Sequence, residues 1–177
     1  MIEGQDHIRL WPYIRGNVPR GTSLALWQMI EAEGGMERLF YGQVPTPSAY
    51  STIGDPAEFL ALLHKPNTLP FLVQDQKTEA MVGLWWFDDV VPGFRASANI
   101  WMSRKSWGKP AREATRTAVE YGFNKLGFVS VWGFTPWPIA KEHAVACGFK
   151  EITTLPGYVC LDGRERDVFV LRRCRDG

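Results

Sequence analysis

The chain has 177 residues, of which 45% are hydrophobic and 22% are charged, and its 20 Lys and Arg against 19 Asp and Glu leave a formal net charge of +1. A chain of this length suits a single domain that buries about 70% of the surface of the unfolded chain. The hydrophobic share excludes a disordered or fibrous protein. The near-zero charge excludes a global field that would recruit nucleic acid or an anionic membrane.

The cysteines indicate the compartment. Cys147, Cys160 and Cys174 are odd in number and form no C-x-x-C pair, which favours a reduced, cytoplasmic protein over a disulfide scaffold. The first residues, M-I-E-G-Q-D-H, lack the pattern of a signal peptide, and no apolar run approaches the roughly 20 residues that a membrane span needs. The three His and three Cys are scattered without ligand spacing, so no metal site is expected.

Two helices are predicted in the first part of the chain. The first begins at Thr22 or Ser23, whose hydroxyl can accept a hydrogen bond from a free amide of the first turn, and it ends at a Gly pair, 34–35. The second begins at Asp55, in a capping-box arrangement. The Pro- and Ser-containing segment 36–54 between them is predicted to be a long loop that covers a site.

The remainder alternates strands and helices. L-P-F-L-V-Q and A-M-V-G-L-W-W-F, with a polar turn between them, predict a hairpin, and the D-D-V-V-P-G-F turn leads to a third strand over 98–103. This order predicts one mixed α/β domain over residues 1–177. The later elements are expected to be a helix over 110–126, a strand over 129–134, a helix over 137–147 and two final strands joined at Asp162 and Gly163.

Three further residue pairs have an ordinary structural interpretation. Trp85 and Trp86 point to opposite faces of their strand, so at most one of them lines a pocket. The Asp pair at 88–89 is expected in a turn, which favours this residue type. His143 and Cys147 stand four apart on one helix, close enough to touch, and are expected to be a surface His and a helix-end Cys rather than a nucleophile pair.

A strand that opens through a short loop into a helix is a device that binds phosphate with main-chain groups, and 96–127 reads in this way. Gly148 and Phe149 then begin a strand, and D-G-R-E-R-D-V-F-V-L-R closes the chain with Asp167 before an apolar run. Together these features resemble the GNAT superfamily of acyl-CoA-dependent N-acyltransferases. They look closest to members that act on ribosomal-protein N-termini and to GNAT-like proteins carried by phages.

The resemblance covers roughly residues 70–173, and it implies a cofactor-binding core there with a variable front part over 1–69. It implies a single domain of α/β (α+β) type, in which helices flank a mixed, mostly antiparallel twisted sheet. The family's loop pattern, R/Q-x-x-G-x-G/A, falls on 107–112. Trp107, Pro110 and Arg112 depart from that pattern.

Acetyl-CoA is the acyl donor that the resemblance implies. Pro110 has no N–H, and the loss of one donor to a charged ligand costs about 1.5–3 kcal/mol, which a phosphate contact from Lys109 or Arg112 would offset. Main-chain groups of Ile100 and Met102 would hold the pantetheine. The residues expected around the pyrophosphate are Trp107, Gly108, Lys109, Ala111 and Arg112.

The implied reaction is direct transfer of an acetyl group to a primary amine of a small molecule or peptide. The family's Tyr acid falls on Ala144, and no Asp, Glu or His lies between Phe94 and Ser103. Tyr158 is therefore the candidate proton donor, and Asp88, through a water chain, the candidate base. The alternative is a non-catalytic GNAT-fold protein, either an acyl-CoA-binding regulator or a structural protein of phage origin. A homodimer is compatible with the resemblance.

Overall fold

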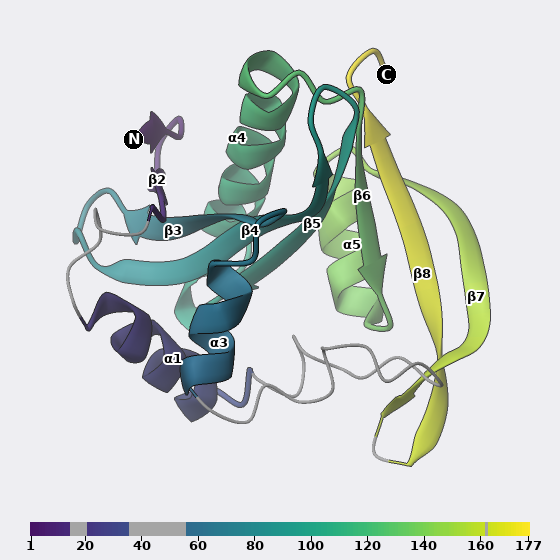
Figure 1. The fold of residues 1–177 in the computed structure, drawn as a ribbon, viewed down its shortest axis with the longest axis horizontal. Coiled ribbons are helices and arrows are strands. Elements are labelled where there is room, and N and C mark those ends of the chain that lie inside the picture. The colour runs from purple at the N-terminus through teal and green to yellow at the C-terminus, as the bar shows by residue number, and fades with distance from the viewer. Residues whose placement is uncertain (15–20, 36–55, 162) are drawn as a thin grey trace.

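The computed structural model describes residues 1–14, 21–35, 56–161 and 163–177. One open sheet of eight strands, in the order β1-β2-β3-β4-β5-β6-β8-β7, runs through the molecule with helices on both faces (Figure 1). Neighbouring strands are antiparallel except for β5 and β6, which are parallel. The predicted mixed, mostly antiparallel α/β architecture is confirmed.

The first five strands form an antiparallel meander. Its first two strands were not predicted, although I-R-L-W-P alternates and buries Ile8 and Leu10 while Trp11 is exposed. The strands are β1 (Ile2–Glu3), β2 (Ile8–Pro12), β3 (Leu69–Asp75), β4 (Met81–Val91) and β5 (Arg95–Met102).

The second half follows the predicted order of elements, with ends that shift by a few residues. It contains η1 (Arg104–Ser106), α4 (Lys109–Lys125), β6 (Ser130–Thr135), α5 (Pro138–Ala146), β7 (Lys150–Leu161) and β8 (Arg164–Cys174). The helices of the first half are α1 (Thr22–Ala32) and α3 (Pro56–Leu63).

The start of α1 differs from the prediction. The residue before the helix is Gly21 with φ 95°, and no side chain caps the first turn. The predicted hydroxyl cap is wrong because the Ser23 hydroxyl lies 2.5 Å from the Tyr13 hydroxyl instead, which joins α1 to the end of β2. The predicted cap of the second helix, Asp55, and the predicted loop 36–54 lie outside the described residues.

The Asp pair does not form the predicted turn. β4 continues through it to Val91, and the register between β4 and β5 shifts between Asp88 and Val91. Asp89 has φ 48°, a conformation that Asp tolerates better than most residues. The two aspartates therefore lie in a bulge of the strand, and the chain turns after it.

Each face of the sheet has its own hydrophobic core. Trp85 and Phe87 pack against α4 on one face, while Leu84 and Trp86 pack against α1 and α3 on the other. The prediction that the two tryptophans point to opposite faces is confirmed. The two faces are called the α4 face and the α1 face below.

The N-terminal hairpin is fastened to α4 by one carboxylate. Glu113 accepts hydrogen bonds from the main-chain amides of Asp6, His7 and Ile8, with N···O distances of 2.9, 3.1 and 3.4 Å. Gly4 is required beside it, because a Cβ there would meet both this carboxylate and the Ile8 carbonyl. Ile8 and Leu10 then reach the core of the α4 face.

Replacing Glu113 with Ala should destabilise the fold by about 1–3 kcal/mol, because three amides lose a charged acceptor while the helix keeps a good helix former. Urea denaturation measures the change. Glu142→Ala is the matched control, since Glu142 is an exposed glutamate on α5. Equal effects of the two substitutions would show that the hairpin is not held by this carboxylate.

Candidate functional site

The sheet opens between β5 and β6. These strands pair over three residue pairs only, Arg95↔Ser130, Ala96↔Val131 and Ser97↔Trp132. Beyond them the two strands diverge, and the edge of β5 from residue 98 to residue 102 has no strand partner on this side within the described chain. Main-chain groups in such an edge are free to bind a ligand.

The alternation of the β4–β5 ladder decides which groups face the opening. The Ser103 amide donates to the Val82 carbonyl at 2.9 Å, so every second residue of β5 before it also bonds to β4. The main-chain groups of Ala98, Ile100 and Met102 therefore point away from β4, toward β6. The structure places the predicted Ile100 and Met102 at the opening.

A cavity of about 760 Å³ occupies this opening. Strands β5 and β6 form its walls and α5 closes one side. Aromatic rings dominate its lining, yet they leave the volume free rather than filling it. They belong to Trp85, Trp101, Trp107, Phe134, Trp137 and Phe149.

The loop before α4 presents free main-chain donors beside this cavity. In the described part of the chain, the amides of Gly108, Lys109 and Ala111 donate to no acceptor, whereas the Arg112 amide donates to the Gly108 carbonyl at 3.0 Å. Pro110 occupies the first turn, as predicted. Any contact of Arg112 with a ligand must therefore use its side chain.

Gly108 leaves room for a ligand at this loop. Its φ of 95° and ψ of −123° suit glycine, and a Cβ at this position would meet no atom within 4 Å. The glycine is therefore required by the backbone conformation rather than by crowding. Open space, free amides and the positive end of a helix together fit a pyrophosphate.

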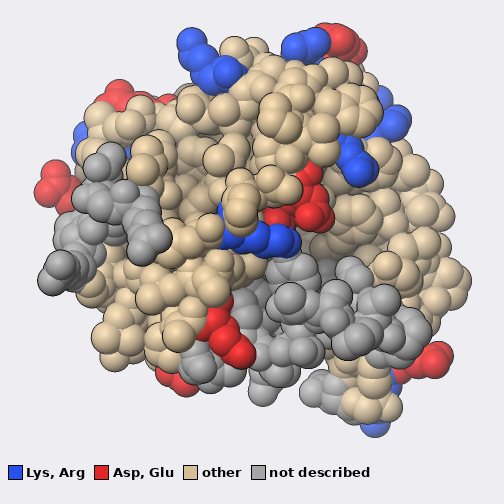
Figure 2. Space-filling model, in the orientation of Figure 1, with Lys and Arg blue, Asp and Glu red and all other residues tan. Residues whose placement is uncertain are grey.

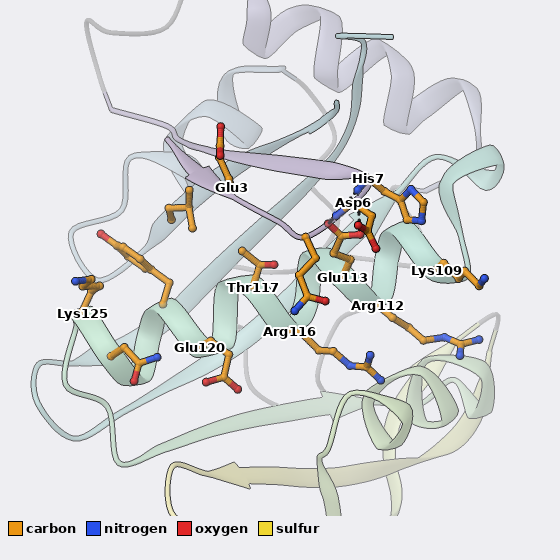
Figure 3. Close-up of a pocket in the computed structure, with 14 residues that line it drawn as sticks. Glu3, Asp6, His7, Lys109, Arg112, Glu113, Arg116, Thr117, Glu120 and Lys125 are labelled. Carbon is orange, nitrogen blue, oxygen red and sulfur yellow. Dashed lines mark hydrogen bonds between the residues drawn. The ribbon is translucent and has the colours of Figure 1, made fainter. Parts of the chain in front are cut away.

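Basic side chains continue from this loop along α4. Lys109, Arg112 and Arg116 line a second cavity of about 750 Å³, between α4 and the turn of the β1–β2 hairpin. Figure 3 shows Glu113 reaching from α4 to this turn at Asp6, while the three basic side chains project from another side of the helix. They provide positive charge next to the free amides.

Charge is otherwise dispersed. Figure 2 shows a face on which Lys and Arg alternate with Asp and Glu, without a continuous basic or acidic area. Within the described residues no group of three His, Cys, Asp or Glu side chains is placed to hold a metal ion. The same residues contain no helix long and apolar enough to cross a membrane.

The structure does not bring the two predicted proton-transfer residues to the cavity. Asp88 is buried on the α1 face, where it accepts a hydrogen bond from the Thr68 hydroxyl at 3.0 Å and lies 3.6 Å from the Lys65 ammonium. Tyr158 is 39% exposed on β7 and does not line the cavity. These positions leave both residues without direct access to a ligand between β5 and β6.

Sequence reasoning missed Glu33. This residue follows α1 and lines the cavity, where its carboxylate accepts from the Arg104 amide at 2.8 Å. The Arg104 guanidinium donates to the Glu33 carbonyl in return. Seventy-one positions separate the two residues, and no local pattern links them, so only the packing of α1 against the sheet could reveal this contact.

His143 was expected on the surface, and this prediction is wrong. It is 9% exposed and lines the cavity, because α5 packs on α4 at this point. Its Nε2 lies 2.9 Å from the Thr115 hydroxyl and 3.8 Å from Cys147 Sγ, and its ring meets Trp107 edge-on. The predicted His–Cys contact is confirmed.

Burial controls the protonation of this pair. It lowers the pKa of His143 to about 4, with a further contribution from Arg112 and Arg116, and it raises the pKa of the Cys147 thiol. His143 is therefore neutral and Cys147 is a thiol at neutral pH. This agrees with the interpretation that they are not a nucleophile pair.

The depressed pKa of His143 predicts a pH effect on stability. Below pH 6.5 the unfolded chain binds a proton at this residue, whereas the folded chain binds it only near pH 4, so stability present above 6.5 is lost as the pH falls toward 4. The loss attributable to His143 is on the order of 2–3 kcal/mol. Urea denaturation between pH 4 and 7 measures it.

The variant His143→Asn lacks the pH-dependent contribution of the imidazole. The difference in free energy of unfolding between this less stable variant and the unchanged protein should therefore shrink as the pH is lowered. His7→Asn, at an exposed position, serves as the control and should follow the unchanged protein throughout. A constant deficit for His143→Asn at every pH would show that the imidazole does not stay neutral in the folded state.

No protein-family model matches the sequence, and no curated protein matches it. Solved structures do match. The spermidine N-acetyltransferase from Vibrio cholerae in complex with CoA and spermine superposes with a TM-score of 0.75 at 20% identity, over 96% of each chain. The dodecameric structure of this enzyme in an intermediate state gives a TM-score of 0.70 at 17% identity, over 96% of this chain and 94% of that chain.

A structure of the same Vibrio cholerae enzyme in complex with manganese ions gives a TM-score of 0.69 at 19% identity, over 95% of this chain and 92% of that chain. Identities of this size establish the fold and leave the activity to be argued from the site. The strand order, the divergence of β5 from β6 and these superpositions agree: the chain has the GNAT fold.

Proposed function

We propose that this protein is an acyl-CoA-dependent N-acyltransferase that moves an acetyl group from acetyl-CoA directly to a primary amine. The observation that carries the proposal is the opening between β5 and β6, with unpaired main-chain groups along one wall and three free amides at the adjoining helix start. A thioester with a long amide-bearing arm and a pyrophosphate is the ligand class that this combination fits.

The chain's own groups can be assigned to the parts of the donor. Main-chain groups of Ile100 and Met102 bind the amides of the pantetheine, and the free amides before α4 bind the pyrophosphate. The side chains of Lys109 and Arg112 add charge-assisted contacts to phosphate, which offset the donor that Pro110 lacks. Trp107 lines the cavity mouth beside this loop. When bound, acetyl-CoA supplies an acyl group activated as a thioester.

The reacting groups follow from the same geometry. The Met102 amide, which faces the opening, is placed to stabilise negative charge on the thioester oxygen. The amine must lose a proton before it attacks, and Glu33 is the carboxylate that lines the cavity in the described chain. Asp88 is left to act only through a chain of waters, and Tyr158 remains the sequence-based candidate for reprotonating the thiolate.

A second candidate function is acyl-CoA binding without catalysis. One observation favours it: Ala144, at the position of the family's Tyr acid, lines the cavity and has no group that can donate a proton. Two observations favour the enzyme: the Glu33 carboxylate is held in the cavity wall by the Arg104 amide, and the cavity has room for a ligand.

The proposal extends to the location, self-association and origin of the protein. The three free cysteines support the predicted cytoplasmic location. The solved dodecameric acetyltransferase supports self-association of this chain. A phage origin rests on the sequence resemblance alone.

Addition of acetyl-CoA should raise the melting temperature, because a ligand that binds only the folded state stabilises it by about 2.7 kcal/mol at one hundred times its dissociation constant. Release of the CoA thiol in the presence of primary amines then measures turnover. Stabilisation without thiol release would support the binding protein, and absence of both would refute the proposal.

Gly108→Ala should weaken acetyl-CoA binding at least tenfold, because a side chain shifts the backbone that aims the free amides. Gly163→Ala is the matched control: Gly163 also has a positive φ, 70°, and open space around its Cβ position, but it lies in the β7–β8 turn. Calorimetric titration measures binding in each variant. Equal weakening in both variants would mean that the loop before α4 does not hold the ligand.

A further inference from the structure

The cavity has two halves of different character, and the half on the α1 face must receive the acceptor. Side chains of Asn99 and Trp101 point to the α1 face, because they alternate with Ala98 and Ile100, which pack against the α4 core. The free amides that we assign to the donor precede α4 on the opposite face. The acceptor amine therefore enters from the α1 face.

Among the described residues, the acceptor half carries one acidic and one basic side chain. Its described lining residues are Glu33, Gly35, Asn99, Trp101, Arg104, Phe134 and Leu161. Only one of these is acidic, and its carboxylate already accepts a hydrogen bond from the Arg104 amide. The Arg104 side chain adds one positive charge, so the charged groups sum to zero.

This balance among the described residues disfavours an acceptor with several ammonium groups. Each ammonium that leaves water needs an opposite charge or full hydrogen bonding, and one engaged carboxylate cannot serve two or three of them. Cation–π contact with Trp101 can hold a single ammonium. Loss of one proton before attack makes a monoamine neutral, which matches the walls, whereas a polyamine stays charged.

The rim of the cavity favours an apolar body on the amine. Phe134 is 46% exposed and lines the acceptor half of the cavity. Apolar side chains that are exposed around a cavity gain stability when a ligand covers them. A flat or branched hydrocarbon group on the acceptor would do so.

We propose that the acceptor is a monoamine with an aromatic or branched apolar body, and not a polyamine. This inference rests on the proposed function and names the substrate class of that site. It assigns the acceptor from this chain's own cavity walls, whereas the structural neighbour was solved with spermine.

The test compares phenethylamine, n-butylamine and spermidine in two measurements. Thiol release with acetyl-CoA gives kcat/KM for each amine, and calorimetric titration in the presence of CoA gives each dissociation constant. The value of kcat/KM should be at least tenfold higher for phenethylamine than for spermidine, and the dissociation constant at least tenfold lower, because a hydrophobic pocket discriminates by about tenfold or more for a single methylene group.

Two variants test which residues of the cavity determine the preference for phenethylamine over spermidine. Phe134→Ala should lower kcat/KM for phenethylamine about tenfold and leave n-butylamine within about threefold, because only the larger amine covers this ring. Phe94→Ala is the control, since Phe94 is 54% exposed at the β4–β5 turn and does not line the cavity. Asn99→Asp adds a carboxylate to the acceptor half and should shift the ratio toward spermidine at least tenfold.

The outcomes separate the two proposals. Tighter binding or faster turnover of spermidine than of phenethylamine overturns the inference and leaves the acyltransferase intact. Absence of thiol release with every amine overturns the proposed function, and the titrations still decide which amine the cavity prefers. An equal response of Phe134→Ala and Phe94→Ala also overturns the inference.

Discussion

The site depends on two strands that are held apart while each is held firmly in place. β5 is paired to β4 as far as Met102↔Gly83, and β6 is paired to β8 along its length, from Ser130↔Cys174 to Thr135↔Phe169. Each strand has thus satisfied one edge with an antiparallel partner, and the parallel contact between them needs only three residue pairs. The opening is therefore a stable part of the sheet rather than a defect.

Helix α4 connects this opening to the rest of the molecule. Its buried face, which includes Ala111, Ala114 and Ala118, packs against the sheet with small side chains that let the helix approach closely. Its first turn carries the free amides, and Glu113 fastens the N-terminal hairpin to the next turn. One helix thereby couples the stability of the N-terminal hairpin to the position of the free amides, since a shift of α4 would disturb both.

The cavity between β5 and β6 differs in charge from the start of α4, where basic side chains lie beside the free amides. Burial keeps His143 uncharged in the wall, and the Glu33 carboxylate and the Arg104 guanidinium each form a hydrogen bond with the main chain of the other residue. Lys109 and Arg112 lie on α4 outside the cavity. Such a division suits a ligand whose charge is concentrated at one end, because phosphates meet cations while the reacting end enters an apolar space.

Local signals in the sequence determined the elements and the fold class. The strand and helix patterns between residues 69 and 174, the Pro in the first turn of α4 and the Gly108 loop could be predicted because each depends on neighbours a few residues away. Only the tertiary structure decided which side chains reach the cavity. Glu33 and His143 enter it, and Asp88 and Tyr158 do not, because these positions follow from how α1, α5 and the strands pack across long separations in the chain.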